Sequence, residues 1–320
     1  MTAAETLDVV VRALAVVAAF LLLPLLVGQT EHKVMAHMQG RLGPMYAGGF
    51  HGWAQLVADG VKFVQKEDVV PAAADRPVFR LAPAVALVPY LVALSAVPLS
   101  DQLVAADLDG GLLFVLAASA VGVLGTLMAG WSSANKYALL GAMRSAAQLL
   151  AYEIPLILAA SSVAMAAGTL SLIGIAQAWQ WWWLAWQAPA ALVFLIAGLA
   201  ELKRPPFDMP LADSELVFGP YTEYTGLRFA LFLLAEYAGI VLLSALTAVL
   251  FLAGWRGPGP EVLGPVWTLL KTGLVALLVI WVRVSWPRLR EDQLQRLSWA
   301  VLVPVALGQL VLTAAVIITR

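Results

Sequence analysis

The sequence contains no cysteine, only three histidines and few charged residues, and each shortage excludes a class of function. Without cysteine the chain forms no disulfide and holds no iron–sulfur cluster through thiolate. The histidines, His32, His37 and His51, stand five and fourteen residues apart, which favours ordinary interfacial residues over a haem or metal site. We therefore expect no metal, haem or iron–sulfur ligands in this chain.

Charged residues make up only 12% of the chain and hydrophobic residues 62%. Soluble domains average about 25% charged and about 45–50% apolar residues, so the apolar surplus needs a lipid solvent. The 19 basic and 20 acidic residues nearly balance, which gives no indication of a nucleic-acid partner. The composition thus predicts an integral membrane protein rather than a soluble enzyme.

Long apolar runs define the expected architecture, since a helix needs about 20 apolar residues to cross a bilayer. We predict an all-α integral membrane protein that forms a single membrane domain over residues 1–320. The eight predicted spans lie near 9–28, 81–100, 111–131, 146–168, 181–200, 227–253, 266–285 and 299–319. An even number of spans places both termini on one side.

Basic residues set the predicted orientation, because Lys and Arg are retained in the cytoplasmic loops. The loops after spans one, three, five and seven hold nearly all of them, whereas the opposite loops hold only Arg256 and, at the chain end, Arg320. We expect both termini on the outer, periplasmic side.

Residues 50–66 are too short for a span and are amphipathic at helical spacing. The apolar side of this segment consists of Phe50, Trp53, Leu56, Val57, Val61 and Val64. His51, Gln55, Asp59, Lys62 and Lys66 form the polar side. We predict an interfacial helix, for which a simple membrane anchor is the alternative role.

The loop 201–226 combines acidic, basic and aromatic residues, and its four prolines prevent a single helix. Its carboxylates are Glu201, Asp208, Asp213, Glu215 and Glu223. Apolar residues between them suggest a loop folded against protein, where carboxylates raise one another's pKa values and exchange protons near neutral pH. A structural salt-bridge cluster is the alternative.

Two further carboxylates fall inside predicted spans. Glu153 and Glu236 lie about 10 and 13 Å from the inner surface at about 1.5 Å per residue. Each would cost at least about 2.5 kcal/mol facing lipid, so both are expected to face protein or water. Tyr152 and Tyr237 stand beside them, and the pattern favours a proton or ion pathway over a purely structural role of the two carboxylates.

Five stretches give the chain a family resemblance over nearly its whole length. They are EHKVMAHMQGRLGP at 31–44, LVADGVKFVQKED at 56–68, NKYALLGAMRSAAQLLAYEIPL at 135–156, AELKRPPFDMPLADSELVFGPYTEYTGLRFALFLLAEY at 200–237 and WVRVSWPRLREDQLQRLSW at 281–299. In these five stretches the sequence resembles a membrane subunit of respiratory complex I, the proton-translocating NADH:quinone oxidoreductase. The subunit is the one at the quinone site, called H in bacterial naming.

The resemblance implies a multi-pass subunit of the bacterial inner membrane that carries no electrons itself. Its substrate would be a quinone, ubiquinone or menaquinone, while FMN and iron–sulfur clusters would belong to partner subunits. Expected partners are the soluble quinone-site and iron–sulfur subunits, the small and antiporter-like membrane subunits, and lipid.

The resemblance also assigns residues. The quinone channel and chamber would include Arg41, Gly43, Pro44, Asp59, Lys62, Lys66, Arg204, Phe207, Asp208, Asp213, Glu215, Glu223 and Tyr224. The proton relay would use Tyr152, Glu153, Glu201, Glu236 and Tyr237. Supporting charges would be Lys136, Arg144, Arg228, Arg283, Arg288, Arg290 and Asp292.

The sequence departs from the family pattern at several of its motifs. Met45 stands where Asn is usual, Leu211 replaces a carboxylate, and Asp213 is one carbon shorter than the usual Glu. Lys203 stands where Asn is common, and Glu291 where Tyr is common. Quinone type, coupling efficiency or electron donor could therefore differ.

Two alternatives remain open from the sequence. The same fold occurs in membrane-bound hydrogenases and ferredoxin-linked proton-pumping complexes. A hydrogenase subunit encoded beside this gene would favour that alternative. A stand-alone ion transporter would predict inverted repeats, and the sequence contains none that we can recognise.

Overall fold

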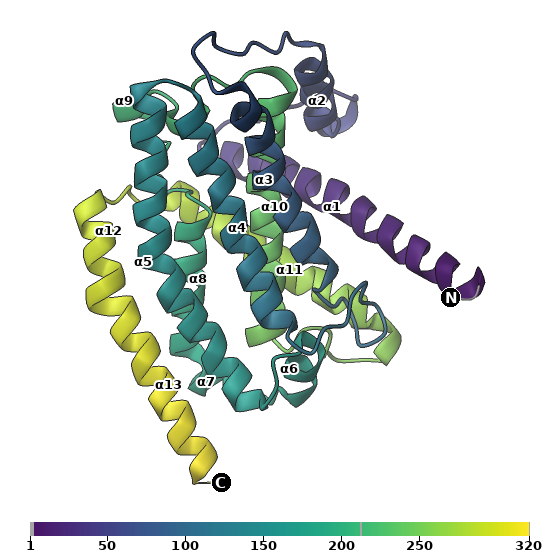
Figure 1. Ribbon diagram of the computed structural model, residues 1–320. Helices are drawn as coiled ribbons and strands as arrows, with labels where there is room; N and C mark the ends of the chain where they lie inside the picture. The colour runs from purple at the N-terminus through teal and green to yellow at the C-terminus, as the bar shows by residue number, and fades with distance from the viewer. Residues whose placement is uncertain (1–2, 212, 320) are drawn as a thin grey trace.

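The computed structural model describes residues 3–211 and 213–319, and within these ranges helices joined by loops are the regular structure, with no strand (Figure 1). The all-α class is therefore confirmed. Seven helical segments of the described residues are long and apolar enough to cross a membrane. They are Val9–Met38 of α1 (Ala3–Met38), α3 (Arg76–Ser95), α4 (Gly111–Ser132), α5 (Lys136–Ala167), α10 (Gly226–Phe251), Glu261–Ser285, which includes α11 (Gly264–Ser285), and Glu291–Ile318. The last segment joins α12 (Glu291–Leu297) to α13 (Val303–Ile318) through a π-helical turn.

The predicted fifth span, 181–200, differs from the other seven. It consists of the one-turn helix α7 (Trp183–Trp186) and the helix α8 (Ala188–Glu201), which has 14 residues. Pro189 stands in the first turn of α8, where a missing N–H is harmless, so it starts a new helix. At 1.5 Å per residue α8 rises about 21 Å, less than the hydrocarbon thickness of about 30 Å. The count of eight spans stays a prediction.

Helix ends extend beyond the predicted spans. α1 continues to Met38, ten residues past the predicted boundary at 28. α5 begins at Lys136, where the Asn135 side chain accepts a hydrogen bond from the Tyr137 backbone N–H at 2.9 Å. It ends at Ala167, and the following Gly168 has a φ of 70°, which suits a helix C-terminus. Hydropathy marks the depth of the lipid, whereas these capping residues mark the ends of the helix.

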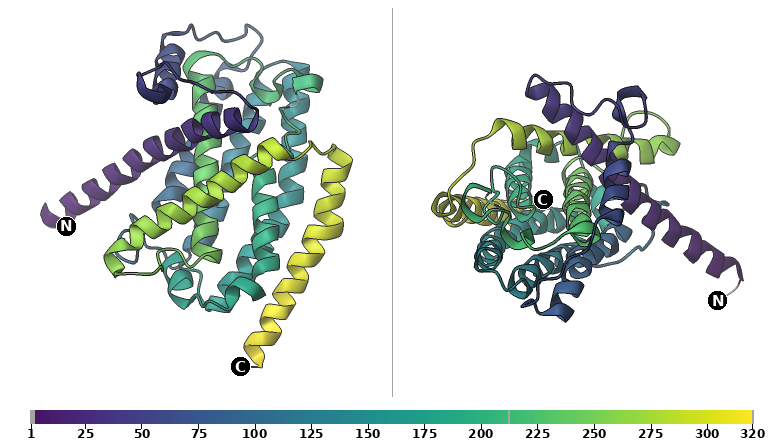
Figure 2. Two further views of the ribbon diagram at one scale, coloured as in Figure 1. Left: turned by 180° about the vertical axis from the view of Figure 1, so that it is seen from behind. Right: turned by 90° about the horizontal axis from the view of Figure 1, so that it is seen from above.

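α10 is the central helix of the bundle and packs against α1, α3, α8 and α11. Around it, α3, α4, α5 and α8 pack in sequence, and α13 packs on α5. Small residues allow the closest approach: a Cβ added to Gly125 of α4 would lie 2.4 Å from the backbone nitrogen of Ala86 in α3. α1 leaves the bundle at an angle, and its apolar part is almost unburied (Figure 2).

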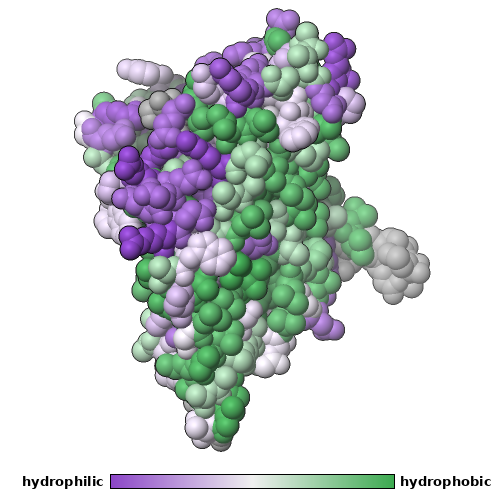
Figure 3. Space-filling model, turned by 60° about the vertical axis from the view of Figure 1, so that its left-hand side comes forward, coloured by the Kyte–Doolittle hydropathy of each residue, from purple (hydrophilic) through white to green (hydrophobic). Residues whose placement is uncertain are grey.

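The four loops predicted to share one side of the membrane meet at one end of the molecule. The loop before α3 joins the end of α4 through a hydrogen bond from Asp75 N to Ser132 O of 3.0 Å. The loop after α11 joins loop 201–226 through Leu289 N and Pro206 O, also at 3.0 Å. Hydrophilic residues gather at this end above a broad hydrophobic band (Figure 3). The arrangement agrees with the predicted loop grouping, while the outward position of the termini stays a prediction.

Short helices occupy the loops. The predicted interfacial segment 50–66 forms a 3-10 turn (Phe50–Gly52) and α2 (Gln55–Gln65), which lies at the hydrophilic end. Within 201–226 the chain forms α9 (Asp213–Leu216) and a second 3-10 turn (Gly219–Tyr221). At the opposite end lie α6 (Leu172–Ala178) and a further 3-10 turn (Glu261–Leu263).

Candidate functional site

Four charged side chains, two buried and two partly exposed, form a group that we call the inner charge cluster: Glu31, Arg204, Glu236 and Arg283. The Arg204 side chain is 2% exposed; its Nη1 pairs with Glu31, and its Nε lies 2.6 Å from Glu236 Oε1. Arg283 pairs with the other carboxylate oxygen of Glu31. Because two cations face two anions, the cluster is neutral as a whole, which offsets the high cost of removing each charge from water.

Four separate elements bring the inner charge cluster together. Glu31 comes from the extension of α1, Arg204 from loop 201–226, Glu236 from α10 and Arg283 from the last turn of α11. Tyr237 places its ring 4.8 Å from the Arg204 guanidinium carbon, a cation–π contact. Arg204, Glu236, Tyr237 and Arg283 were predicted as site residues, but Glu31 was missed. The helix-forming residues after position 28 indicate that the first helix continues, but they do not indicate which residues Glu31 pairs with.

Next to this cluster lies a cavity of about 40 Å³ that is lined by groups from both the loop and the membrane helices. Its polar lining includes Glu201, Lys203, Tyr221, Glu236 and Thr126. Lys203 Nζ donates a hydrogen bond of 2.6 Å to Thr126 Oγ1 of α4. A polar space of this size accommodates water.

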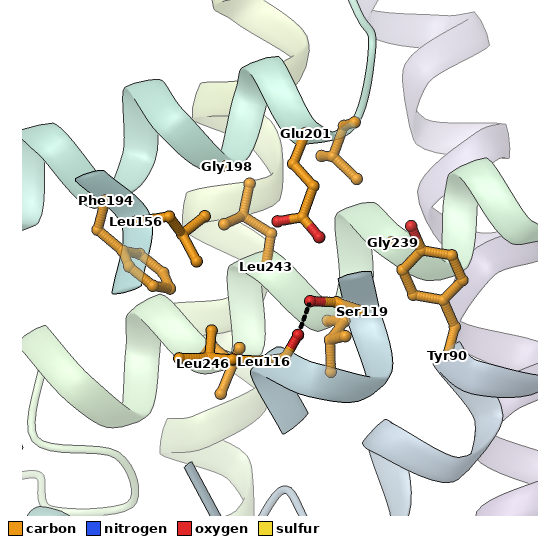
Figure 4. A pocket seen from close by; sticks show the side chains of 12 residues that line it. Tyr90, Leu116, Ser119, Leu156, Phe194, Gly198, Glu201, Gly239, Leu243 and Leu246 are labelled. Atoms are coloured by element: carbon orange, nitrogen blue, oxygen red, sulfur yellow. Dashed lines mark hydrogen bonds between the residues drawn. The ribbon is translucent and has the colours of Figure 1, made fainter. Parts of the chain in front are cut away.

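A second cavity of about 20 Å³ continues from the first, and Glu201 and Tyr90 line both. Glu201 and Tyr90 extend toward it from α8 and α3, and the Ser119 hydroxyl donates to the Leu116 carbonyl at 2.9 Å (Figure 4). The remaining lining is mostly apolar. Glu201, at the C-terminal end of α8, is therefore the carboxylate that lines both cavities.

Burial changes the acidity of the loop groups around these cavities. Burial lowers the pKa of Lys203 to about 8, although the carboxylates of Glu236 and Glu201 act in the opposite direction. Burial also raises the pKa of the Tyr221 phenol, which therefore stays protonated at neutral pH. Lys203 was noted in the sequence only as a departure from the family, and its position in a cavity could not be predicted.

The second membrane carboxylate, Glu153, lies half-buried on α5 and acts electrostatically on Glu201. Its neighbour Tyr152 is buried and donates its hydroxyl to the backbone carbonyl of Leu294 at 2.9 Å. The structure thus brings Glu153 toward Glu201, while Tyr152 links α5 to α12.

Loop 201–226 carries an exposed ion-pair group at its outer side. Glu215 lies 2.5 Å from Arg144 Nη1 and 3.4 Å from Arg288 Nη2, and Arg144 also lies 3.7 Å from Glu291. The hydrogen bond from Arg144, together with the charges of Arg144 and Arg288, holds the pKa of Glu215 below its usual range. These contacts connect α5, the loop and the segment after α11.

The aromatic and remaining acidic residues of the loop are held by neighbouring helices. Tyr224 stacks on Phe79 with ring centres 4.0 Å apart, and its hydroxyl donates to the Phe79 carbonyl at 3.1 Å. Glu223 accepts a hydrogen bond of 2.7 Å from Asn135 Nδ2. Phe207 is buried and Asp208 half-buried, while the side chain of Asp213 lies outside the described residues. Burial raises the pKa of the Tyr224 phenol to about 12.

The predicted quinone entrance lies where α1 turns into the segment before α2. Gly43 has a φ of +67°, a left-handed conformation that suits glycine, and the Pro44 carbonyl accepts a hydrogen bond from Lys33 Nζ. Arg41 is exposed and donates to Gln39 at 2.9 Å. Asp59 of α2 accepts from Gln55 at 3.0 Å.

The remaining predicted charges lie mostly at the surface. Lys62 is 3.7 Å from Asp59, and Arg228 is 3.0 Å from Asp68. Lys66, Lys136, Arg290 and Asp292 are exposed. Within the described residues, no group of three or more His, Asp or Glu side chains is arranged to hold a metal ion.

Comparison with known proteins identifies the family of this chain. The sequence profile described as NADH dehydrogenase matches residues 11–314. The NADH-quinone oxidoreductase H subunit of Geobacillus kaustophilus is 46% identical over 306 residues, 95% of this chain and 91% of the relative. The chain belongs to the H-subunit family of NADH-quinone oxidoreductase. The corresponding protein of Anoxybacillus flavithermus is 48% identical over 290 residues, 89% of this chain and 87% of the relative.

Membership of the H-subunit family and the fold agree with each other. The relatives are bacterial, and the described chain has seven helices suited to crossing a bilayer. The protein is a multi-pass membrane subunit of the complex I type in the bacterial inner membrane. The resemblance found in the sequence motifs is thereby confirmed.

Proposed function

We propose that this chain walls the quinone channel and chamber of a proton-translocating NADH:quinone oxidoreductase and couples quinone reduction to proton movement through its carboxylates. The names of the relatives favour this function over that of a hydrogenase or ferredoxin-linked complex. The chain supplies no electron carrier in this proposal: flavin and iron–sulfur clusters belong to partner subunits, and the quinone is the substrate.

The observation that carries the proposal is the contact between Arg204 and Glu236. Arg204 belongs to loop 201–226, the predicted chamber wall, whereas Glu236 lies within α10. A charge that forms near the loop during quinone reduction would act on the Arg204 guanidinium. Because Arg204 holds both Glu31 and Glu236, any shift of the cation changes the stability of the Glu236 carboxylate.

Quinone chemistry provides the driving event. Reduction of a quinone to quinol takes up two electrons and two protons, and charged intermediates are costly in a site that excludes water. Proton uptake by one carboxylate then alters its neighbours, so protonation can pass from Glu236 toward Glu201 and Glu153. Each proton moved against 100 mV stores about 2.3 kcal/mol.

The first test asks which complex contains the chain. The tagged chain is purified from its own host in mild detergent, and NADH oxidation is measured after a short-chain quinone is added. Inhibitor-sensitive oxidation together with flavin and iron–sulfur subunits supports the proposal. Hydrogenase or ferredoxin-linked subunits without NADH oxidation would contradict it.

The second test addresses the carboxylates in the same complex, reconstituted in vesicles. We expect Glu236→Gln, Glu153→Gln and Asp208→Asn to lower proton translocation to about a tenth or less, given the usual effect of losing a proton-transfer group. Electron transfer to a water-soluble acceptor upstream of the quinone should stay unchanged. Glu261→Gln, in the turn at the opposite end of the molecule, is the matched control. Wild-type translocation in all three variants would disprove the carboxylate role.

A further inference from the structure

Lys203 has an unusual backbone conformation for a lysine. Its φ is +56°, in the left-handed region that non-glycine residues adopt infrequently. Its backbone N–H donates to the Ala200 carbonyl at 3.0 Å, which closes the C-terminal end of α8. The turn directs the side chain inward to Thr126 on α4 rather than toward the surface ion pairs of the loop.

The charged and titratable groups around Lys203 come from every element that packs against it. Glu201 belongs to α8, Glu236 to α10, Tyr221 to the 3-10 turn Gly219–Tyr221 and Tyr90 to α3. The guanidinium of the adjacent Arg204 instead pairs with Glu31 and Glu236 in the inner charge cluster. Lys203 is thus the amine in a cavity with two carboxylates from different helices.

We infer that Lys203 carries protons between Glu236 and Glu201, as an amine inserted into the carboxylate chain. The inference rests on the proposed function, because it assigns a step within the same proton path. It adds a residue that alternates between ammonium and amine to a series of acids.

The transfer can be written with its protons balanced. The Lys203 ammonium gives one proton, through a water in the cavity, to the carboxylate of Glu201, which leaves an amine and a carboxylic acid. Protonated Glu236 then gives one proton to the amine, which restores the ammonium and leaves a carboxylate. Each step moves one proton and no electron, so the charge of the three groups together is unchanged.

Three observations support this role over a purely structural one. The cavity of about 40 Å³ leaves room for water beside the Nζ. Within the described residues Lys203 Nζ donates its one hydrogen bond to Thr126, whereas an ammonium has three N–H groups to donate. Burial lowers the pKa of Lys203 to about 8, so a measurable fraction of amine exists near neutral pH.

The decisive variant is Lys203→Arg in the intact complex. Arginine keeps the positive charge and can still donate to Thr126, but it does not release a proton in proteins. We expect normal electron transfer to the upstream acceptor, whereas protons translocated per NADH fall to about a tenth or less. A Lys203→Arg complex with the wild-type ratio would overturn the inference, because charge alone would then suffice.

Lys271 provides a matched control for the replacement of a lysine whose side chain points into the protein. Its Nζ donates to the backbone carbonyls of Leu252, Gly254 and Arg256 at 2.6–2.7 Å, so its partners are not titratable. We expect Lys271→Arg to keep the wild-type ratio of protons to NADH. A loss equal to that of Lys203→Arg would show that arginine merely disturbs the bundle, and this too would overturn the inference.

A pH profile keeps the inference falsifiable if Lys203→Arg does not assemble. In the wild type, translocation should change through a step near pH 8, where Lys203 titrates. Thr126→Val removes the acceptor that stabilises the ammonium, so the step should move to lower pH. An unmoved step would overturn the inference.

The comparison with Glu236→Gln separates the inference from the function that it deepens. If Glu236→Gln translocates protons normally, the proposed carboxylate chain fails and the inference fails with it. If Glu236→Gln stops translocation but Lys203→Arg does not, only the role of Lys203 is wrong.

Discussion

Glu31 and Arg204, 173 residues apart in sequence, form an ion pair in which the side chains are 1% and 2% exposed. Arg283 pairs with the second oxygen of the same carboxylate. One glutamate on the extension of α1 therefore holds two arginines, one from the loop of the predicted chamber and one from α11. This arrangement makes Glu31 the anchor of the inner charge cluster and leads to the first prediction.

Replacement of Glu31 by Gln should destabilise the protein strongly. The change leaves Arg204 and Arg283 facing each other without their shared anion, and breaking a buried ion pair costs about 3–5 kcal/mol. We expect faster thermal inactivation of the complex and less of this chain in purified samples. Asp59→Asn, on the partly exposed side of α2, is the control. An unchanged inactivation rate would show that Glu31 is not the anchor.

Replacement of Glu215 by Gln should loosen the loop in a pH-dependent way. Because Arg144 lowers the pKa of Glu215, the ion pair stabilises the folded loop above the unfolded value of 4.5 and this contribution is lost as pH falls through the lower folded pKa. Hydrogen exchange of backbone amides in 213–218 should be faster in Glu215→Gln than in wild type at pH 7. The two rates should converge in acid.

The pair is exposed, so salt should reduce the same difference. High salt at pH 7 should therefore bring wild-type exchange toward the rate of Glu215→Gln. A rate difference that persists unchanged in acid and in salt would mean that Glu215 acts by packing rather than by charge.

Replacement of Gly125 by Ala should separate α3 from α4. The new Cβ would lie 2.4 Å from Ala86 N and 2.6 Å from Ala86 Cα, which are backbone atoms that move only with the helix. Overpacking of this kind costs about 1–3 kcal/mol, which should appear as a lower melting temperature in detergent. Gly273→Ala on α11 meets nothing within 4 Å and should be neutral or stabilising. Equal melting temperatures for the two variants would contradict the close packing.

The sequence predicts most of the bundle because lipid imposes a simple requirement: a spanning helix must be long and apolar. Seven of the predicted runs satisfy it as single helical segments in the described chain. Residues 181–200 do not, because α7 ends at Trp186 and Pro189 stands in the first turn of a separate helix that begins after Gln187. The local effect of a proline overrides the hydropathy average there.

The candidate site was predictable in its composition but not in its pairing. Arg204 and Glu236 could be selected from the sequence because a charged side chain near or within a span is costly in lipid and is therefore expected to have a functional or structural partner. Glu31 could not, because its partners Arg204 and Arg283 come from loops and helices that only the tertiary fold brings together. The inward direction of the Lys203 side chain depends on the left-handed φ of that residue. A left-handed φ is predictable where the sequence has a glycine, and here it has a lysine.

The predicted orientation can be measured directly because the chain contains no cysteine, so one introduced thiol is its only labelling site. Tyr46 is 95% exposed before α2, and Val262 is 86% exposed in the turn before α11, at the opposite end of the molecule. If the basic loops are cytoplasmic, a membrane-impermeant maleimide added to intact spheroplasts should label this chain in Val262→Cys but not in Tyr46→Cys. Permeabilised cells should allow labelling of both, which shows that each thiol is reactive. Labelling of Tyr46→Cys alone in intact spheroplasts would invert the topology, and the inner charge cluster would then open toward the periplasm, where no NADH-oxidising arm could dock.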